Sequence, residues 1–564
     1  MMTRFTSALT LLIGLLAVNA TSSASVLHVH VVDAETKRAI PCRITVVDSA
    51  GKLAPIEVAK SPRLAIRTGV VYTSDGSADI GVPAGQYTIF ATRGPRYSLA
   101  RQSVTAGNTS ADVRLQIRRE VELPGYVSVD SHIHTLQFSG HGDSSAEERL
   151  VTLAGEEIEM PISTEHNRQV DYAPFAAATG TSQYLTPVVG NEVTTPVGHF
   201  NIFPAKPDGT PPPWQSKDRA EILAGIRATP GVRVVTFNHP WDTHAQVQPD
   251  SSDRFHALSG ESLDGNPWSA DAVEVINSSA EQSDAMRPFR DWFALLNCGM
   301  PIVAVGASDS HDVNAFIVGQ ARTYVKSSAT RPDRIDVEEV CRNLKAGRAL
   351  VSLGLVTEMW VNGTFGVGDL ASGPGREMRV RVRVQGARWM AADRVELYGN
   401  GRLLASRNVE SKPDTVTKAD ITFVLPKPAY DMWLVAIASG PGPDDDTAPY
   451  WPLARPYQPT RADWEPRLIG ATNPIRIDGD GDGKYSSPHD IATRLMDDSR
   501  GDAVRLVKAL EAFDPAVTVQ AAAVCRQRGI DLSKGAGAKA VEGASPAVRQ
   551  AITAYFIVLK RERE

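Results

Sequence analysis

Between residues 122 and 355, short apolar runs alternate with stretches that have helical periodicity. The strand candidates include "EMPIST", "VRVVTFNHP" and "MPIVAVGAS", and the helix candidates include "RAEILAGIRAT" and "MRPFRDWFALLNCG". Another stretch, "SSAEERLVTLAGEE", begins with a serine cap and early glutamates, which indicates the start of a helix. Because strands and helices that alternate along a chain form βα units, we expect a parallel barrel or sheet in this region.

Side chains that bind metals follow many of these apolar runs, where each strand is expected to end. The chain has only twelve histidines, yet three of them lie in the stretch "VDSHIHTLQFSGHGD". One such histidine alone is more often a capping or core residue, but a whole set at strand ends is not expected by chance. Catalytic groups of βα barrels lie at the carboxyl ends of the strands. The candidate ligands are His132, His134, His141, His166, Glu192, His199, His239, Asp309 and His311.

The segments "DSHIH", "TEHN", "GNEV", "NHP" and "SDSH", in this order, resemble the PHP family, which is named for polymerase and histidinol phosphatase domains. The resemblance covers about residues 121–355. It implies a distorted (βα)7 barrel with a cleft for two or three divalent ions. Nitrogen and carboxylate ligands without a thiolate suit zinc, manganese or iron.

The resemblance also implies how the ligands divide among the ions. The first ion would be held by His132, His134, Glu192 and Asp309. The second would be held by His141, His166 and His311, and the third by His199, His239 and the bridging Glu192. In the family pattern, Asp130 would be a carboxylate that orients a histidine ring.

Four further residues are candidates for contacts with a substrate. Asn167 and Arg168 directly follow His166 and could face the cleft. His244, in "HPWDTH", could donate a proton, and Arg322, in "QARTYV", could pair with an anionic group of the substrate. A structural or surface role is an equal alternative for each of them.

The flanking regions indicate a multidomain chain. Residues 1–24 combine Arg4, an apolar run and small residues, which is typical of a cleaved signal peptide; a buried N-terminal strand is the alternative. Residues 25–120 alternate apolar and polar positions and resemble a carboxypeptidase regulatory-like β-sandwich. Residues 356–440 predict a second β-sandwich, residues 441–486 a linker, and residues 487–564 a helical tail. We expect a periplasmic or secreted protein with no membrane span in the mature chain.

A second candidate metal site lies in the expected linker, in "DGDGDGKYSSPHD". Asp478, Asp480 and Asp482 match the first three ligand positions of a calcium loop, and Gly483 matches its sharp turn. Ser486 occupies the ninth position, but His489 stands at the twelfth, with Asp490 beside it. The loop therefore departs from an EF-hand, and both a structural calcium site and a solvated acidic turn remain open.

Composition narrows the range of functions. The net charge of −6 gives no hint of a nucleic-acid partner, which would usually require a basic face. The four cysteines lie far apart, which favours four separate core thiols over a disulfide. The sequence thus predicts an exported metal-dependent hydrolase that acts on a small ester or phosphoester, most simply a phosphoesterase. Flanking β-domains resemble the branch near the carbaryl hydrolases, so a carbamate, ester or amide hydrolase is one alternative. A non-catalytic surface binding protein is another.

Overall fold

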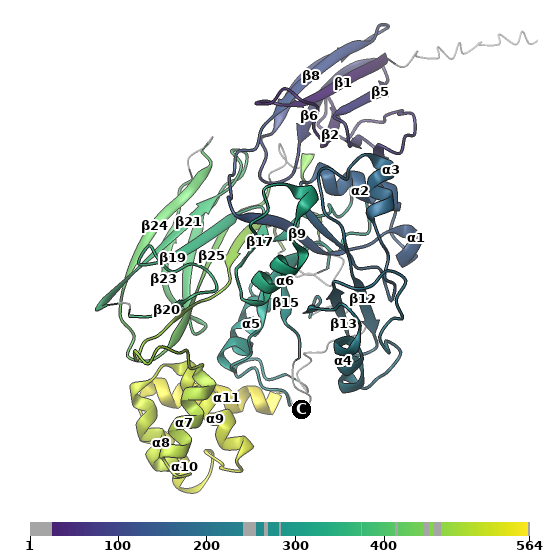
Figure 1. The fold of residues 1–564 in the computed structure, drawn as a ribbon. Helices are drawn as coiled ribbons and strands as arrows, with labels where there is room; N and C mark the ends of the chain where they lie inside the picture. Colours follow the sequence, from purple (N-terminus) through teal and green to yellow (C-terminus); the bar gives the residue numbers. More distant parts are fainter. Residues whose placement is uncertain are drawn as a thin grey trace, which may run out of the picture.

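The computed structural model shows a multidomain α/β protein (Figure 1). It describes residues 25–561 except 241–254, 264, 266–268, 281–283, 374, 412–414, 444–449 and 456–463. The expected signal peptide therefore lies outside the described residues. A β-domain at the N-terminus and a helical region at the C-terminus lie at opposite ends of the molecule, with the α/β region between them (Figure 1).

The N-terminal domain has two sheets, ordered β5-β1-β8 and β3-β4-β2-β6-β7. Leu27, Val29 and Val31 alternate with less buried residues along β1 and join an apolar core to which both sheets contribute. This period of two is what the sequence predicted. The strands are β1 (Ser25–Asp33), β2 (Cys42–Asp48), β3 (Leu64–Arg67), β4 (Val70–Thr73), β5 (Ser77–Val82), β6 (Gly85–Thr92), β7 (Ala100–Ala106) and β8 (Ala111–Ile117).

Two sheets also form the central region. In the larger one, β9 (Tyr126–Ile133), β10 (Met160–Ser163) and β11 (Val188–Val189) run parallel. The smaller is ordered β12 (Asn191–Thr195), β13 (Gly198–Phe203), β14 (Val234–Phe237), β15 (Ala272–Asn277) and β16 (Val303–Ala307). Isolated parallel bridges, Ile133 to Ser310 and His166 to Glu192, connect segments of the two sheets. Both bridges lie where strands end and candidate ligands follow.

The central strands differ from the expected all-parallel arrangement at two places. Strand β17 (Ala321–Lys326) is antiparallel to β9 and to the strand that follows it, and β13 is antiparallel to both β12 and β14. Only Pro196 and Val197 separate β12 from β13. A two-residue turn can join antiparallel strands, whereas a parallel crossover needs a dozen or more residues.

Helices of the central region lie between its strands in sequence. The second of them, α2, begins with a capping box in which Ser145 and Glu148 each accept from the other's backbone N–H, as the sequence predicted. It packs against the N-terminal domain through β2, β3 and β4. The helices are α1 (Leu136–Ser139), α2 (Ala146–Gly155), α3 (Ala173–Thr179), α4 (Arg219–Ala228), α5 (Arg287–Asn297) and α6 (Val337–Lys345), with a 3-10 turn, η1, at Pro332–Arg334.

The larger central sheet continues into the second β-region instead of ending near residue 355. From β9 it passes through β17 (Ala321–Lys326) and β18 (Ala349–Leu353) to β26 (Arg467–Thr472), β25 (Met432–Pro441), β22 (Arg394–Gly399) and β23 (Arg402–Asn408), with β20 (Leu370–Ala371) and β27 (Ile475–Ile477) at its side. A separate sheet of β19 (Val356–Val361), β21 (Glu377–Gln385) and β24 (Thr417–Pro426) shares an apolar core with it. Thus β26 and β27 are buried strands within the expected linker.

The C-terminal tail is helical, as predicted: α7 (Pro488–Asp498), α8 (Ala503–Ala509), the 3-10 turn η3 (Leu510–Ala512), α9 (Pro515–Gln527), α10 (Gly535–Glu542) and α11 (Pro546–Arg561). Tyr555 of α11 anchors the tail to the central region, because its hydroxyl donates to Glu261 at 2.7 Å. The four cysteines are unpaired. Of the helices in the described part of the chain, none has both the length and the apolar character required to cross a bilayer.

Candidate metal centre

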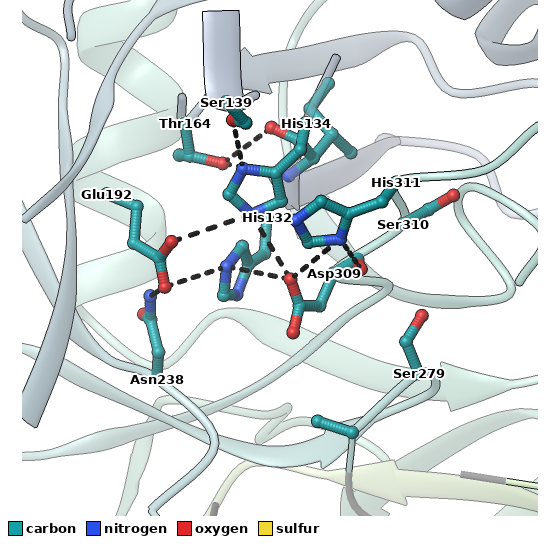
Figure 2. Close-up of polar contacts among 12 residues, drawn as sticks. His132, His134, Ser139, Thr164, Glu192, Asn238, Ser279, Asp309, Ser310 and His311 are labelled. Carbon is teal, nitrogen blue, oxygen red and sulfur yellow. Dashed lines mark hydrogen bonds and ion pairs between the residues drawn. The ribbon is translucent and has the colours of Figure 1, made fainter. Parts of the chain in front are cut away.

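The structure brings all nine candidate ligands into one cluster beside the two bridges that connect the central sheets. Figure 2 shows part of it, with His132, His134 and His311 directed toward Glu192 and Asp309. The residues come from the ends of β9, β10 and β16, from β12 and β13, and from the segments that follow β14 and α1. Segments far apart in sequence therefore build a single site.

Glu192 lies at the middle of the cluster. Its carboxylate oxygens are 2.5 Å from His166 Nδ1, 3.1 Å from His199 Nδ1 and 3.2 Å from His132 Nε2. They are also 3.4 Å from His239 Nε2 and 3.7 Å from His134 Nε2. Five imidazoles thus surround one buried carboxylate.

Asp309 is the second acid of the cluster. Its Oδ1 atom is 3.2 Å from Nε2 of both His132 and His134. Three sets of side chains place their ligand atoms within 4.8 Å of one another. The sets are His132, His134 and Asp309; His134, His166 and His311; and His132, Glu192 and His239.

These sets overlap with, but differ from, the division that the family resemblance implied. His134 replaces His141 in the histidine set, and His132 replaces His199 beside Glu192 and His239. His141 lies at the edge, where its ring stacks on His311 at 4.2 Å between centroids and its Nε2 is 3.0 Å from His166 Nε2. His199 contacts Glu192 through Nδ1.

The donor set fits a divalent cation. Within the described residues, the buried Nε2 atoms of His132, His134 and His311 make no well-aligned hydrogen bond, and those of His132 and His134 face carboxylate oxygens at 3.2 Å. Burying a polar nitrogen without a partner is costly, and a bound cation would remove that cost. Imidazole and carboxylate ligands without a thiolate suit zinc, manganese or iron.

The electrostatics differ from ring to ring. Burial opposes the protonated form of His132, but Asp309, Glu274 and Glu192 raise its pKa well above the ordinary value, as buried acids do when no cation lies among them. Burial, with the neighbouring His311 and His166, lowers the pKa of His134 well below its ordinary value. Burial, with His141 and His166, does the same to the pKa of His311. Both rings are therefore neutral at pH 7, as a metal ligand must be.

The orientation of His132 depends on Glu274, which sequence reasoning missed. Glu274 Oε1 is 2.7 Å from His132 Nδ1, and its other oxygen accepts from the His239 backbone N–H at 2.8 Å and from Asn277 Nδ2 at 3.0 Å. The signal was present, because "DAVEVIN" puts a carboxylate inside an apolar strand, where it needs a partner.

A second supporting chain reaches His134. Ser139 Oγ lies 3.0 Å from His134 Nδ1 and donates to Glu165 Oε2 at 2.5 Å. Glu165 also accepts from the hydroxyls of Thr135 and Tyr172. These contacts fix the ring so that Nε2 faces the cluster, and neither Ser139 nor Glu165 was predicted.

Asp130 does not orient a histidine ring as expected. Its carboxylate accepts from the Ser308 hydroxyl at 2.6 Å and from the backbone N–H groups of Ser308, Gly319 and His132. Asp130 thus holds together the backbones that carry His132 and Asp309, and Glu274 orients the ring instead.

The structure does not bring Arg322 into the cluster, so the expected pairing with a substrate anion is not supported. Arg322 is fully buried, and its guanidinium donates to the carbonyl oxygens of Gly319 and Glu156. Sequence alone could not show that these carbonyls lie within reach. His244 lies outside the described residues.

Asn167 and Arg168 differ in what they contact. The Asn167 side chain accepts from the Thr194 backbone N–H at 3.1 Å and donates to its carbonyl, which secures the segment after β10 to β12. Arg168 is exposed. Asn167 therefore supports the bridge between His166 and Glu192.

At the candidate calcium loop, Asp478 and Asp480 gather with Asp431, a residue that was not predicted. The other predicted ligands have different roles: Asp490 caps α7, Asp482 accepts from the Lys484 backbone, and the Ser486 N–H donates to Asp431. The predicted five-residue ligand set is therefore not assembled.

Comparisons with known proteins identify no family for this chain. No protein-family model matches it, and no curated protein is similar to it at a significant level. A solved structure from Bacteroides vulgatus, of a two-domain protein containing a predicted PHP-like metal-dependent phosphoesterase, is 15% identical and covers 54% of this chain and 87% of its own. The TM-score of 0.29 is too low to carry an argument.

Proposed function

We propose that this protein is a hydrolase that depends on divalent transition metals. The observation that carries the proposal is the convergence of buried imidazole nitrogens, three without a well-aligned hydrogen bond among the described residues, on Glu192 and Asp309. A binding protein without catalysis would not need so complete a set of ligands.

The chain's own residues would hold the ions and leave one side open. His132 and His134 have no exposed side-chain area, whereas His166 is 23% and His311 14% exposed. A substrate therefore approaches from the side of His141, His166 and His311. When bound, divalent ions supply Lewis-acid polarisation of the scissile bond and lower the pKa of water to about 7.

The substrate class that we propose is a small phosphoester. Support comes from the ordered motifs around the ligands, which resemble those of a family that mainly cleaves phosphoesters. A carbamate, ester or amide could be cleaved at the same cluster, because polarisation of a carbonyl needs the same groups. We further propose that the protein is exported, on the strength of the signal-like residues 1–24.

The chemistry is tested by assaying the metal-loaded protein against p-nitrophenyl phosphate, bis-p-nitrophenyl phosphate, a naphthyl carbamate and p-nitrophenyl acetate. We expect hydrolysis of a phosphate ester that stops with chelator and returns with manganese or zinc. The matched control is Glu192→Gln, which should be inactive. Activity on the carbamate alone would replace the proposed substrate class, and activity on none of the four would contradict a hydrolase.

Export is tested separately by isolating the protein from the cells that make it and determining the mature N-terminus by mass spectrometry. We expect a chain that starts after Ala20 or Ala24, in the periplasmic or secreted fraction. An uncleaved chain in the cytoplasm would contradict export and leave the metal chemistry untouched.

A further inference from the structure

We propose that Arg67, in the N-terminal β-domain, is a positioning residue for the histidine side of the metal centre, and thus that this domain is required for full metal occupancy. The inference rests on the metal centre proposed above. It concerns the set that contains His134, His166 and His311, together with the adjacent His141.

Arg67 ends β3 and reaches into the central region at the loop that carries His141. Its Nε donates to Asp143 Oδ2 at 2.8 Å, and its Nη2 donates to Asp143 Oδ1 at 2.9 Å and to the Asp143 carbonyl at 2.6 Å. Nη1 donates to Glu148 of α2 at 2.9 Å. One guanidinium therefore holds the side chain and the backbone of the loop at once.

A lone exposed ion pair contributes little to structure, because solvent screens it and two long side chains must be ordered. Arg67 differs, since its side chain is only 25% exposed and bonds two carboxylates and a carbonyl. A planar guanidinium suits such paired contacts, and a lysine ammonium cannot reproduce them.

Asp143 also forms hydrogen bonds with the segment that carries His311. Its Oδ1 also accepts from the Val313 backbone N–H at 2.8 Å. The backbone N–H groups of Asp143 and Ser144 both donate to the His311 carbonyl, at 3.2 and 3.1 Å. The two loops are thus hydrogen-bonded at the His311 carbonyl and at Val313, two residues after His311.

Gly142 shows how closely these loops approach. Its φ of +83° lies in the left-handed region, and a Cβ at this position would be 2.5 Å from the His311 carbonyl oxygen and 2.6 Å from its Cβ. Only glycine fits there without displacing His311. Two loops in such contact move together, and the rings of His141 and His311, which these loops carry, stack at 4.2 Å between centroids.

The remaining part of the cluster has separate supports. His132 and His239 are held by Glu274, and Glu192 accepts from Asn238 Nδ2 at 3.1 Å. These groups belong to β9, β12, β15 and the end of β14. Loss of Arg67 should therefore weaken metal binding at the histidine side and leave the set of His132, Glu192 and His239 intact.

The test compares the full chain with Arg67→Met and Arg67→Lys. The matched control is Arg63→Met, because Arg63 also pairs with an aspartate in the N-terminal domain, at 3.1 Å, but 58% of its side chain is exposed. Cobalt(II) is titrated into each metal-free protein, and the ions bound per chain and the visible absorption bands are measured.

We expect the wild type and Arg63→Met to bind the same number of ions with the same spectrum. In Arg67→Met, one ion should bind roughly 10-fold or more weakly, with loss of its absorption band, while the other binding is unchanged. The affinity of Arg67→Lys for this ion should lie between those of the wild type and Arg67→Met. If the methionine variant does not fold, the lysine variant provides the test. Gly142→Ala, which disturbs the same contact from the other side, should show the same selective loss.

Binding in Arg67→Met that equals the wild type would overturn the proposal. Equally weakened binding of every ion would also overturn the proposal, because such a result would indicate general destabilisation of the protein. A wild-type protein that binds no cobalt would instead contradict the metal centre itself. The two failures are therefore distinguishable without any assay of activity.

Discussion

Glu192 and Asp309 enter the same histidine cluster, but their surroundings move their pKa values in opposite directions. Burial would raise the pKa of Glu192, but His166, His132 and His199 hold it well below its ordinary value. Burial raises the pKa of Asp309 despite the histidines near it. Glu192 is therefore the more fully ionised acid when no cation is bound, which makes it the primary anchor for a divalent ion.

Replacement of Glu192 should be the most damaging single change at the site. Glu192→Gln removes a charge that faces five imidazoles, so it should lower metal content and activity more than His199→Ala, which removes one ring at the edge. Metal per chain and hydrolysis are the measurements, with circular dichroism to show that the fold survives. A glutamine variant with wild-type metal content would mean that Glu192 is not a ligand.

Glu274 should matter without being a ligand. Glu274→Gln keeps the shape of the side chain but removes the charge that orients His132, and loss of such a partner typically costs 10–100-fold in metal affinity. Competition with a chelating dye measures this loss. Glu338→Gln, which removes an exposed acid that pairs with Arg233, is the control and should change nothing. Equal affinity in both variants would contradict the role of Glu274.

The sequence could predict the nine clustered candidate ligands because most of them lie in short motifs near the end of an apolar run; His199 lies at the start of a strand and His141 in a loop. It could not predict their supports. Glu274 supports His132 and Glu165 supports Ser139, and in each pair the two residues are far apart in the chain. No local sequence pattern specifies that such residues come into contact. Arg322 shows the reverse error. The sequence offered it as a partner for a substrate anion, but its guanidinium donates to two backbone carbonyls instead.

Among the elements, the β12–β13 hairpin matters most for the site. In its register Glu192 lies opposite Asn201 and Thr194 opposite His199, so Glu192 and His199 are diagonal neighbours on adjacent strands. One tight turn thus delivers an acid and an imidazole to the same cluster. The alternation of strands and helices elsewhere in the region predicted a parallel unit here, and the two-residue connection excludes it.

The expected linker was the other misjudged element. Its proline- and aspartate-rich composition predicted irregular structure, yet Ile475 and Ile477 of β27 and Leu468 and Ile469 of β26 are buried. These strands are short, and they do not pair with each other. Strand β26 pairs with β18 and β25, and β27 pairs with β20 and β25. Such pairing over long separations leaves little trace in a local pattern.

The N-terminus of α2 offers a test at the scale of an element. Ser145→Ala removes the cap that accepts from the Glu148 backbone N–H, which should lower the free energy of unfolding by about 1 kcal/mol. Ser145→Thr keeps a capping hydroxyl and should retain most of that stability. Chemical denaturation of the metal-free protein measures both. No difference between the alanine and threonine variants would show that the cap does not stabilise α2.

For the whole molecule, the attachment of the N-terminal domain depends on a buried ion-pair group. Arg96 and Arg119 approach Glu157, which follows α2, at 2.8 and 2.6 Å. Burial would raise the pKa of Glu157, but Arg96, Arg119 and Arg93 lower it to about 2. The charged form of Glu157 is therefore part of what joins the accessory domain to the central region.

Acid should weaken the attachment of the N-terminal domain within a defined range of pH. The pKa of Glu157 in the folded protein, about 2, lies below the ordinary value of 4.5. The contribution of the charged carboxylate to the free energy of unfolding is therefore fully present above about pH 5 and is lost as the pH falls toward 2. Its size is on the order of 3 kcal/mol, since each pKa unit corresponds to about 1.4 kcal/mol. Urea unfolding of wild type and Glu157→Gln from pH 7 to pH 3 measures it. The stability difference between them should shrink in acid, and a constant difference would contradict the assignment.

The central claim, that the histidine cluster holds transition metals, is tested most directly by counting ions. The measurement is elemental analysis of the protein purified without chelator at neutral pH, before and after reconstitution with zinc, manganese or iron(II). We predict two to three ions per chain, and at most one in Glu192→Gln. No more than trace metal in the wild-type protein, even after reconstitution, would contradict the claim.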